Sequence, residues 1–100
     1  MYEFDIYLPT QSAGGAHVAL DLIEQVKADL REQFGGYTHF TSRNEGAWKV
    51  GSASFYDEVT VLRVLSESES LEEIRELKER LERLFQQKQI LVIGRTVEVI

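Results

Sequence analysis

The loop TQSAGGAH, residues 10–17, carries residue types that can bind an anion. Ser12 offers a hydroxyl, Gly14 and Gly15 leave backbone amides accessible, and His17 falls in the first turn of an expected helix. A loop that follows a strand and opens a helix aims free amides and the positive end of the helix dipole in one direction. The loop has neither GxxxxGK[ST] nor GxGxxG, so it is no nucleotide motif. A Ser- and Gly-rich connection also forms without a ligand, and both interpretations stay open.

A second set of chemically capable residues combines two carboxylates with a histidine. Glu3 and Asp5 are spaced i,i+2 on an expected strand, and His39 lies on another. Two carboxylates beside an imidazole could ligate a metal or perform acid–base chemistry near neutral pH. Acidic residues at this spacing on an exposed strand are more often simply solvated. We therefore expect no metal and no cofactor.

A small-molecule cleft is the third possibility. The sequence provides five side chains that could line a cleft between sheet and helices: Tyr7, His17, His39, Trp48 and Arg63. Convergence of Tyr7 and His39 on a cavity, with one shifted pKa, would favour an enzyme or a ligand-binding protein.

The stretch FGGYTHFTSRNEGAWKVG, residues 34–51, holds four of the seven glycines and the only tryptophan. Its first two glycines follow the expected end of a helix, where the dipole has the wrong sign for an anion. We therefore interpret Gly35 as a helix C-cap and residues 44–46 as a hairpin turn. In this interpretation Trp48 packs at the edge of the sheet.

Hydrophobic periodicity sets the elements that position these residues. Apolar residues alternate in residues 2–8, step by three and four in 16–34 and 71–85, and return to strand patterns between and after these helices. Ser70 and Glu73 have the spacing of a capping box at the start of the second helix. The expected strands are 2–8, 37–42, 47–50 continuing into 55–65 through a bulge or small hairpin near Gly51, and 90–100.

The order β-α-β-β-α-β predicts an α+β, ferredoxin-like sandwich: a four-stranded antiparallel sheet with two helices on one face. The other face would then lack cover from its own chain. If Phe4 and Ile6 point to the helices, Glu3, Asp5 and Tyr7 point away. We expect His39 to join them on the open face, because Phe40 suits the core better.

Composition limits the classes of function. The chain has 100 residues, 43% of them hydrophobic, which is consistent with one domain and a real core. The absence of cysteine excludes disulfides and thiol catalysis. A net charge of −6 argues against nucleic-acid binding. No signal-peptide pattern and no long apolar run are present, so we expect no membrane association and a cytoplasmic location.

The chain resembles small bacterial ferredoxin-like α+β proteins of unknown function. The likeness rests on FGGYT at 34–38, the G-x-W of residues 46–48, the strand EVTVL at 58–62, and LFQQKQILV at 84–92, which includes Gln87 and Gln89. The resemblance implies the same fold and offers no catalytic residues. The chain is similar, more widely, to dimeric ferredoxin-like proteins whose open sheets pack face to face.

We hypothesise that the chain is a non-catalytic interaction or regulatory domain, a homo-oligomer (a dimer or larger) joined through its open sheet face. The alternative is a small-molecule-binding protein or enzyme of the dimeric α+β barrel type, with a small or anionic ligand.

Overall fold

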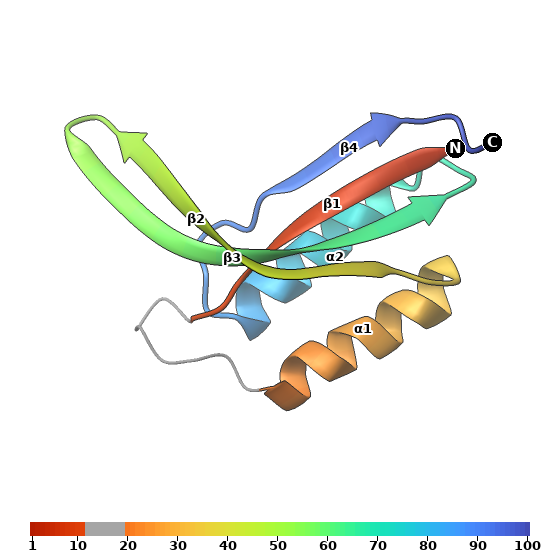
Figure 1. Ribbon diagram of the computed structural model, residues 1–100, viewed down its shortest axis with the longest axis horizontal. Coiled ribbons are helices and arrows are strands. Elements are labelled where there is room, and N and C mark those ends of the chain that lie inside the picture. Colours follow the sequence, from red (N-terminus) through yellow and green to blue (C-terminus); the bar gives the residue numbers. More distant parts are fainter. Residues whose placement is uncertain (12–19) are drawn as a thin grey trace.

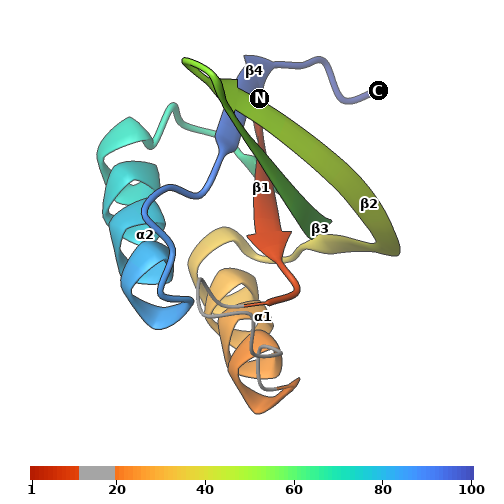
Figure 2. The same ribbon diagram turned by 90° about the vertical axis from the view of Figure 1, so that its left-hand side faces the viewer.

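The computed structural model describes residues 1–11 and 20–100, with Leu20 described by its backbone alone. The elements along the chain are β1 (Tyr2–Pro9), α1 (Leu20–Phe34), β2 (Thr38–Val50), β3 (Ala53–Ser66), α2 (Leu71–Leu84) and β4 (Val92–Thr96). The strands form one antiparallel sheet in the order β2-β3-β1-β4. Both helices lie against one face of it (Figure 1 and Figure 2). The expected ferredoxin-like fold is confirmed.

The core lies between the sheet and the helices. Phe4, Ile6 and Leu8 of β1 are all buried there, which confirms the alternation expected for this strand. The helices and β3 supply most of the remaining core side chains, namely Val26, Leu30, Leu62, Val64, Ile74, Leu77 and Leu81. Gly94 on β4 lets the Phe4 ring approach closely, because a Cβ at residue 94 would lie 2.9 Å from Phe4 Cε1. The buried side chains of the central strands β1 and β3 therefore pack against those of both helices.

The β2–β3 hairpin extends well beyond the rest of the sheet. It turns at Gly51, whose φ is +62°, with Val50 opposite Ala53. Of the bulge or small hairpin expected near Gly51, the structure has the hairpin. The turn expected at residues 44–46 is wrong: β2 runs through these residues, with only a register shift between Phe40 and Asn44. β1 pairs with β3 no further than Val59. We call the projecting part, residues 44–58, the arm (Figure 1).

Of the two expected helix caps, the one at Gly35 is present and the one at Ser70 is not. Gly35 has φ +83° and donates its amide to the Arg31 carbonyl at 2.9 Å, which confirms the C-cap. The capping box at Ser70 is wrong. Ser70 is left-handed, with φ 49°, and its Oγ lies 2.8 Å from Ser68 Oγ and 3.1 Å from Ser66 Oγ. The hydroxyl is held by these serines and caps no helix amide.

Two boundaries differ from those expected. The first helix was expected from residue 16 and is described from Leu20 onward, so its expected start lies outside the described residues. The last strand covers only Val92–Thr96, and Ile90 before it is a buried core residue. Neither described helix has the length and apolar character that crossing a membrane requires.

Candidate functional site

The candidate site is the sheet face that the helices leave open. Its members follow from the alternation in β1 and from the register of its neighbours: Asp5 lies opposite Arg63, Tyr7 opposite Val61, and Glu3 opposite Arg95. The outward position of Glu3, Asp5 and Tyr7 agrees with the sequence. We define the open face by ten residues: Glu3, Asp5, Tyr7, Thr38, Phe40, Val61, Arg63, Leu65, Ile93 and Arg95.

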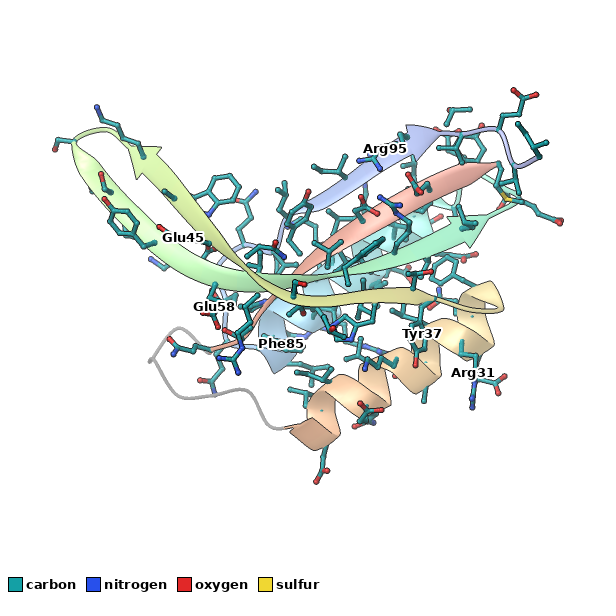
Figure 3. The ribbon with its side chains drawn as sticks, viewed as in Figure 1. Arg31, Tyr37, Glu45, Glu58, Phe85 and Arg95 are labelled. Atoms are coloured by element: carbon teal, nitrogen blue, oxygen red, sulfur yellow. The ribbon has the colours of Figure 1, made fainter. Side chains whose placement is uncertain are left out.

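Two carboxylates and two arginines meet at its centre. Asp5 is only 4% exposed, and it accepts hydrogen bonds from Arg63 Nε at 2.8 Å, Arg63 Nη2 at 3.1 Å and Arg95 Nη1 at 3.1 Å. Glu3 accepts a hydrogen bond from Arg95 Nη1 at 2.6 Å, and its Oε1 lies 2.9 Å from Arg63 Nε. We call these four residues the charge cluster. Its formal charges cancel, and Figure 3 shows the Arg95 member on β4.

The charge cluster shifts the titration of its own members. The hydrogen bond from Arg63 is the main cause that lowers the pKa of Asp5, and Arg95 adds to it against the opposing effect of burial. The same contacts raise the pKa of Arg63 and of Arg95. Asp5 therefore stays ionised well into acid, and its lone pairs are occupied by guanidinium groups. A carboxylate in this state is a poor general base.

His39 lies on the opposite face from the one expected. It pairs with the buried Leu62 and faces the helices, with Nε2 3.1 Å from Thr60 Oγ1. Its Nδ1 is buried, and no hydrogen-bond partner for it is found in the described residues. Burial lowers the His39 pKa, and nearby Lys27 lowers it further, while Glu24 acts in the opposite sense. His39 is therefore held as a neutral ring under α1.

Phe40 takes the place expected for His39. It lies opposite Val61 on the open face, 42% exposed, with its ring centre 5.0 Å from the Arg63 guanidinium carbon. This cation–π contact gives an aromatic ring a partner outside the core. A shift of one residue in register exchanges the two faces of a strand, so the choice between Phe40 and His39 was open to error from local pattern alone.

The four described members of the expected cleft do not converge. Tyr7 and Arg63 share the open face, His39 lies behind the sheet, and Trp48 lies on the arm. Ser12, Gly14, Gly15 and His17 fall outside the described residues. The Glu3–Asp5–His39 combination is likewise divided between two faces. Among residues 1–11 and 20–100, no group of three or more His, Cys, Asp or Glu side chains is placed to hold a metal.

The arm carries exposed apolar residues on the same side as the open face, and Asp57 lies on β3 between the two groups. Trp48 lies opposite Phe55, and Val50 lies opposite Ala53. Alternation along β3 puts Phe55 on the same side as Val61 and Arg63. The exposed fractions are 48% for Trp48, 56% for Phe55 and 69% for Val50. These four arm residues (Trp48, Val50, Ala53 and Phe55) form what we call the arm strip, and the arm curves away from the helices (Figure 1).

The indole of Trp48 makes one hydrogen bond within the arm. Its Nε1 donates to Asp57 Oδ2 at 3.1 Å, and Asp57 lies opposite Gly46. A Cβ at position 46 would lie 2.1 Å from Asp57 Oδ1. Gly46 thus leaves room for the Asp57 carboxylate, whereas the sequence suggested a turn. Glu45 and Glu58, on the other side of the arm strands, are seen in Figure 3.

Arg95 is a member of the charge cluster that the sequence did not single out. It was recognisable only as a basic residue on the expected final strand. Its contact with Glu3 and Asp5 depends on β4 pairing beside β1, with Glu3 opposite Arg95. Spacing along the chain carries no signal for such a distant contact.

One surface hollow borders the open face. It has a volume of about 280 Å³ and is lined by the turn after α1 together with Arg63 and Leu65. Phe34, Tyr37 and Thr38 supply its aromatic and hydroxyl groups. This is slightly smaller than the roughly 300–1,000 Å³ usual for small-molecule sites. The glycine-rich turn therefore does contribute to a concave surface, in addition to capping α1.

Comparisons with known proteins show the fold and no more. No family model matches the chain, and no curated protein does, so the resemblance to small bacterial proteins remains a prediction.

Three similar solved structures all exceed a TM-score of 0.6. A phage SAM lyase in complex with S-methyl-5'-thioadenosine is 10% identical, with a TM-score of 0.63 over 94% of this chain and 79% of that chain. The apo lyase is 13% identical, with a TM-score of 0.66 over 94% and 78%. The divalent cation tolerance protein CutA1 from Thermus thermophilus is 14% identical, with a TM-score of 0.64 over 97% and 84%. The chain thus shares the α+β, ferredoxin-like fold with proteins of differing description.

Proposed function

We propose that the chain is a non-catalytic interaction or regulatory domain that self-associates through its open face and arm. The observation that carries the proposal is the exposed apolar surface formed by the arm strip and the apolar part of the open face. Phe40, Trp48 and Phe55 are each more than 40% exposed on this surface. Aromatic side chains are enriched in protein interfaces, and a large exposed apolar patch is typical of an interaction site.

The free energy available from this surface is substantial. Full burial of one large apolar side chain stabilises a complex by roughly 1.5–3 kcal/mol. Trp48, Phe55 and Phe40 are already half-buried, so each gains about half of that, on the order of 1 kcal/mol. The three together would supply about 3 kcal/mol, before Val50, Leu65 and Ile93 are added. Association must also offset lost translational and rotational freedom, so the whole surface has to take part.

The charge cluster suits a face that is to be covered. Its four members neutralise one another within one copy, so a second copy meets no net charge there. Two isolated acidic residues would have opposed burial strongly. Chemistry, in contrast, finds little support on this face, because Asp5 is engaged by arginines and His39 faces the helices.

Light scattering over a wide dilution range tests the proposal. The wild-type chain should give a mass of at least two chains, and Phe55→Ser should shift the mass toward one chain. Tyr56→Ser is the matched control: Tyr56 is 73% exposed on the same strand and points to the other side of the arm. A wild-type mass of one chain at all concentrations refutes self-association. Equal effects of the two substitutions refute the assignment of the surface.

A second candidate is small-molecule binding at the hollow between the α1–β2 turn and Arg63. The aromatic and hydroxyl lining by Phe34, Tyr37 and Thr38 supports it, as does the bound S-methyl-5'-thioadenosine in the phage lyase of similar fold. S-methyl-5'-thioadenosine is the first probe. It should raise the melting temperature of the wild-type chain and leave that of Leu65→Arg, which fills the hollow, unchanged. No shift with the wild-type chain removes this ligand from consideration.

A further inference from the structure

The arm leaves one strand edge without a neighbour. Pairing of β1 with β3 ends at Val59, and the last bond on that side runs from the Thr10 amide to the Glu58 carbonyl at 2.9 Å. In the part of the chain that the structure describes, no strand lies beside β3 from Ala53 to Asp57 on that side. We call this stretch the arm edge. Its backbone amides and carbonyls are the kind of groups that accept an added strand.

A strand-forming segment lies at the far end of the molecule. β4 ends at Thr96, and the Val97 amide donates to the Met1 carbonyl at 2.9 Å. The residues that follow are Glu98, Val99 and Ile100, rich in β-branched side chains. Val99 is 59% exposed. We call residues 97–100 the tail segment. It has strand composition and only one backbone bond to the neighbouring strands among the bonds found in the described residues.

The arm edge and the tail segment of one copy cannot meet. Figure 1 places the arm and the C-terminal residues at opposite ends of the longest axis, and the molecule extends 42 Å along that axis. β1, β3 and β4 lie between them as a rigid paired sheet. A contact between these two segments therefore requires a second copy.

The two segments match in the alternation of apolar and polar side chains. On the arm, Phe55 belongs to the apolar side, and Ser54 lies opposite Lys49 on the polar side. In the tail segment, Val97 and Val99 share one side of an extended chain and Glu98 takes the other. When the valines lie beside Ala53 and Phe55, Glu98 falls on the other side of the arm, which carries Ser54 together with Lys49, Glu45 and Glu58. The opposite choice of face would place Glu98 beside Phe55, so the alternation favours the face of the tail segment that carries Val97 and Val99.

We propose that the arm edge of one copy pairs as a strand with the tail segment of a second copy, giving head-to-tail association. This rests on the proposed self-association and specifies its geometry. Backbone hydrogen bonds supply the attachment, and the apolar arm strip lies against the neighbour. Because the two halves of the contact are different surfaces, the interface is heterologous and closes into a ring when the rotation permits.

Cross-linking tests the arrangement, since the chain has no cysteine of its own. Ser54 on the arm edge and Glu98 in the tail segment are both exposed and polar, so each tolerates replacement. The double variant Ser54→Cys/Glu98→Cys, treated with a short bis-maleimide, should give covalent dimers and larger species. Each single variant should remain mostly at the mass of one chain. Ser54→Cys/Glu72→Cys places the second thiol on exposed α2 and serves as the control for random collisions.

The outcomes separate the two proposals when the mass in solution is measured on the same samples. A wild-type mass of one chain overturns both. An oligomer whose double variant cross-links no better than the Glu72 control overturns the head-to-tail contact and leaves self-association standing. Efficient cross-linking of a single variant indicates an isologous face-to-face pair and also overturns it.

Discussion

Replacing Asp5 by Asn is the sharpest test of the charge cluster. The substitution keeps the shape of the side chain and removes its charge beneath two guanidinium groups, one at 2.8 Å and one at 3.1 Å. Removing one partner from a buried ion pair typically costs about 3–5 kcal/mol. Glu3 remains within 2.9 Å of Arg63 and still accepts from Arg95, so part of the compensation survives. We therefore expect a loss somewhat below this range, about 2–3 kcal/mol in the free energy of unfolding.

Urea unfolding at pH 7, followed by circular dichroism, measures this loss. Asp29→Asn is the matched control, because Asp29 also binds an arginine, Arg80, at 2.8 Å but is 43% exposed. An exposed pair is worth roughly 0–1 kcal/mol. A cost for Asp5→Asn no larger than that for Asp29→Asn would refute the view that the charge cluster is a buried, cooperative unit.

The dependence of stability on pH in acid gives an independent test of the Asp5 contacts. The Asp5 pKa is lower in the folded chain than its ordinary value, 3.8. Its contribution is therefore fully present above pH 3.8 and is lost as the pH falls through the folded pKa. The difference between wild type and Asp5→Asn should stay constant from pH 7 to pH 5 and shrink below pH 4. A difference that grows in acid would contradict the assigned contacts.

Three further predictions concern single residues. Burial lowers the His39 pKa in the folded chain below 6.5, so the unfolded chain takes up a proton first as the pH falls. Stability should therefore decrease as the pH drops through 6.5. His39→Gln should remove this part of the pH dependence, as measured by urea unfolding. Gly46→Ala should disturb Asp57 and lower the melting temperature, because the added Cβ would lie 2.1 Å from its Oδ1, whereas Ala47→Ser on the same strand should have little effect. Leu62→Ala removes a fully buried side chain between the sheet and the helices and should lower the free energy of unfolding by about 2–5 kcal/mol. A surface change such as Lys49→Ala should lower it by less than about 0.5 kcal/mol. A similarly small loss for Leu62→Ala would contradict the burial of Leu62 in the core.

The fold was predictable because its signals are local. The alternation of β1 and the helical periodicity before Gly35 can each be recognised within a single window of sequence. Features that depend on residues distant in the chain could not be predicted in this way. Gly46 and Gly51 are both plausible turn residues, and only the structure shows that Gly51 makes the turn while Gly46 makes room for Asp57.

The candidate site was predictable only to the level of a face. Placing Glu3 and Asp5 outward required the β1 alternation alone. Assigning His39 required the register of β2 on β3, which local pattern does not set. Arg95 required knowledge that β4 lies next to β1. The predicted helix cap at Ser70 was wrong for a different reason. The sequence had a good capping signal, but the Ser70 hydroxyl is hydrogen-bonded to the neighbouring Ser66 and Ser68.

The position of β1 at the centre of the sheet has a consequence for the route of folding. β1 contains the first strand residues in the sequence, yet its two neighbours are β3 and β4, which come much later. Tyr2 pairs with Ser66 and with Thr96, so neither edge of β1 can close until distant parts of the chain arrive. The β2–β3 hairpin, joined by a tight turn, has no such delay. Strand pairing should therefore begin in the hairpin, with β1 inserting slowly afterwards, as expected for sheets dominated by contacts between distant residues.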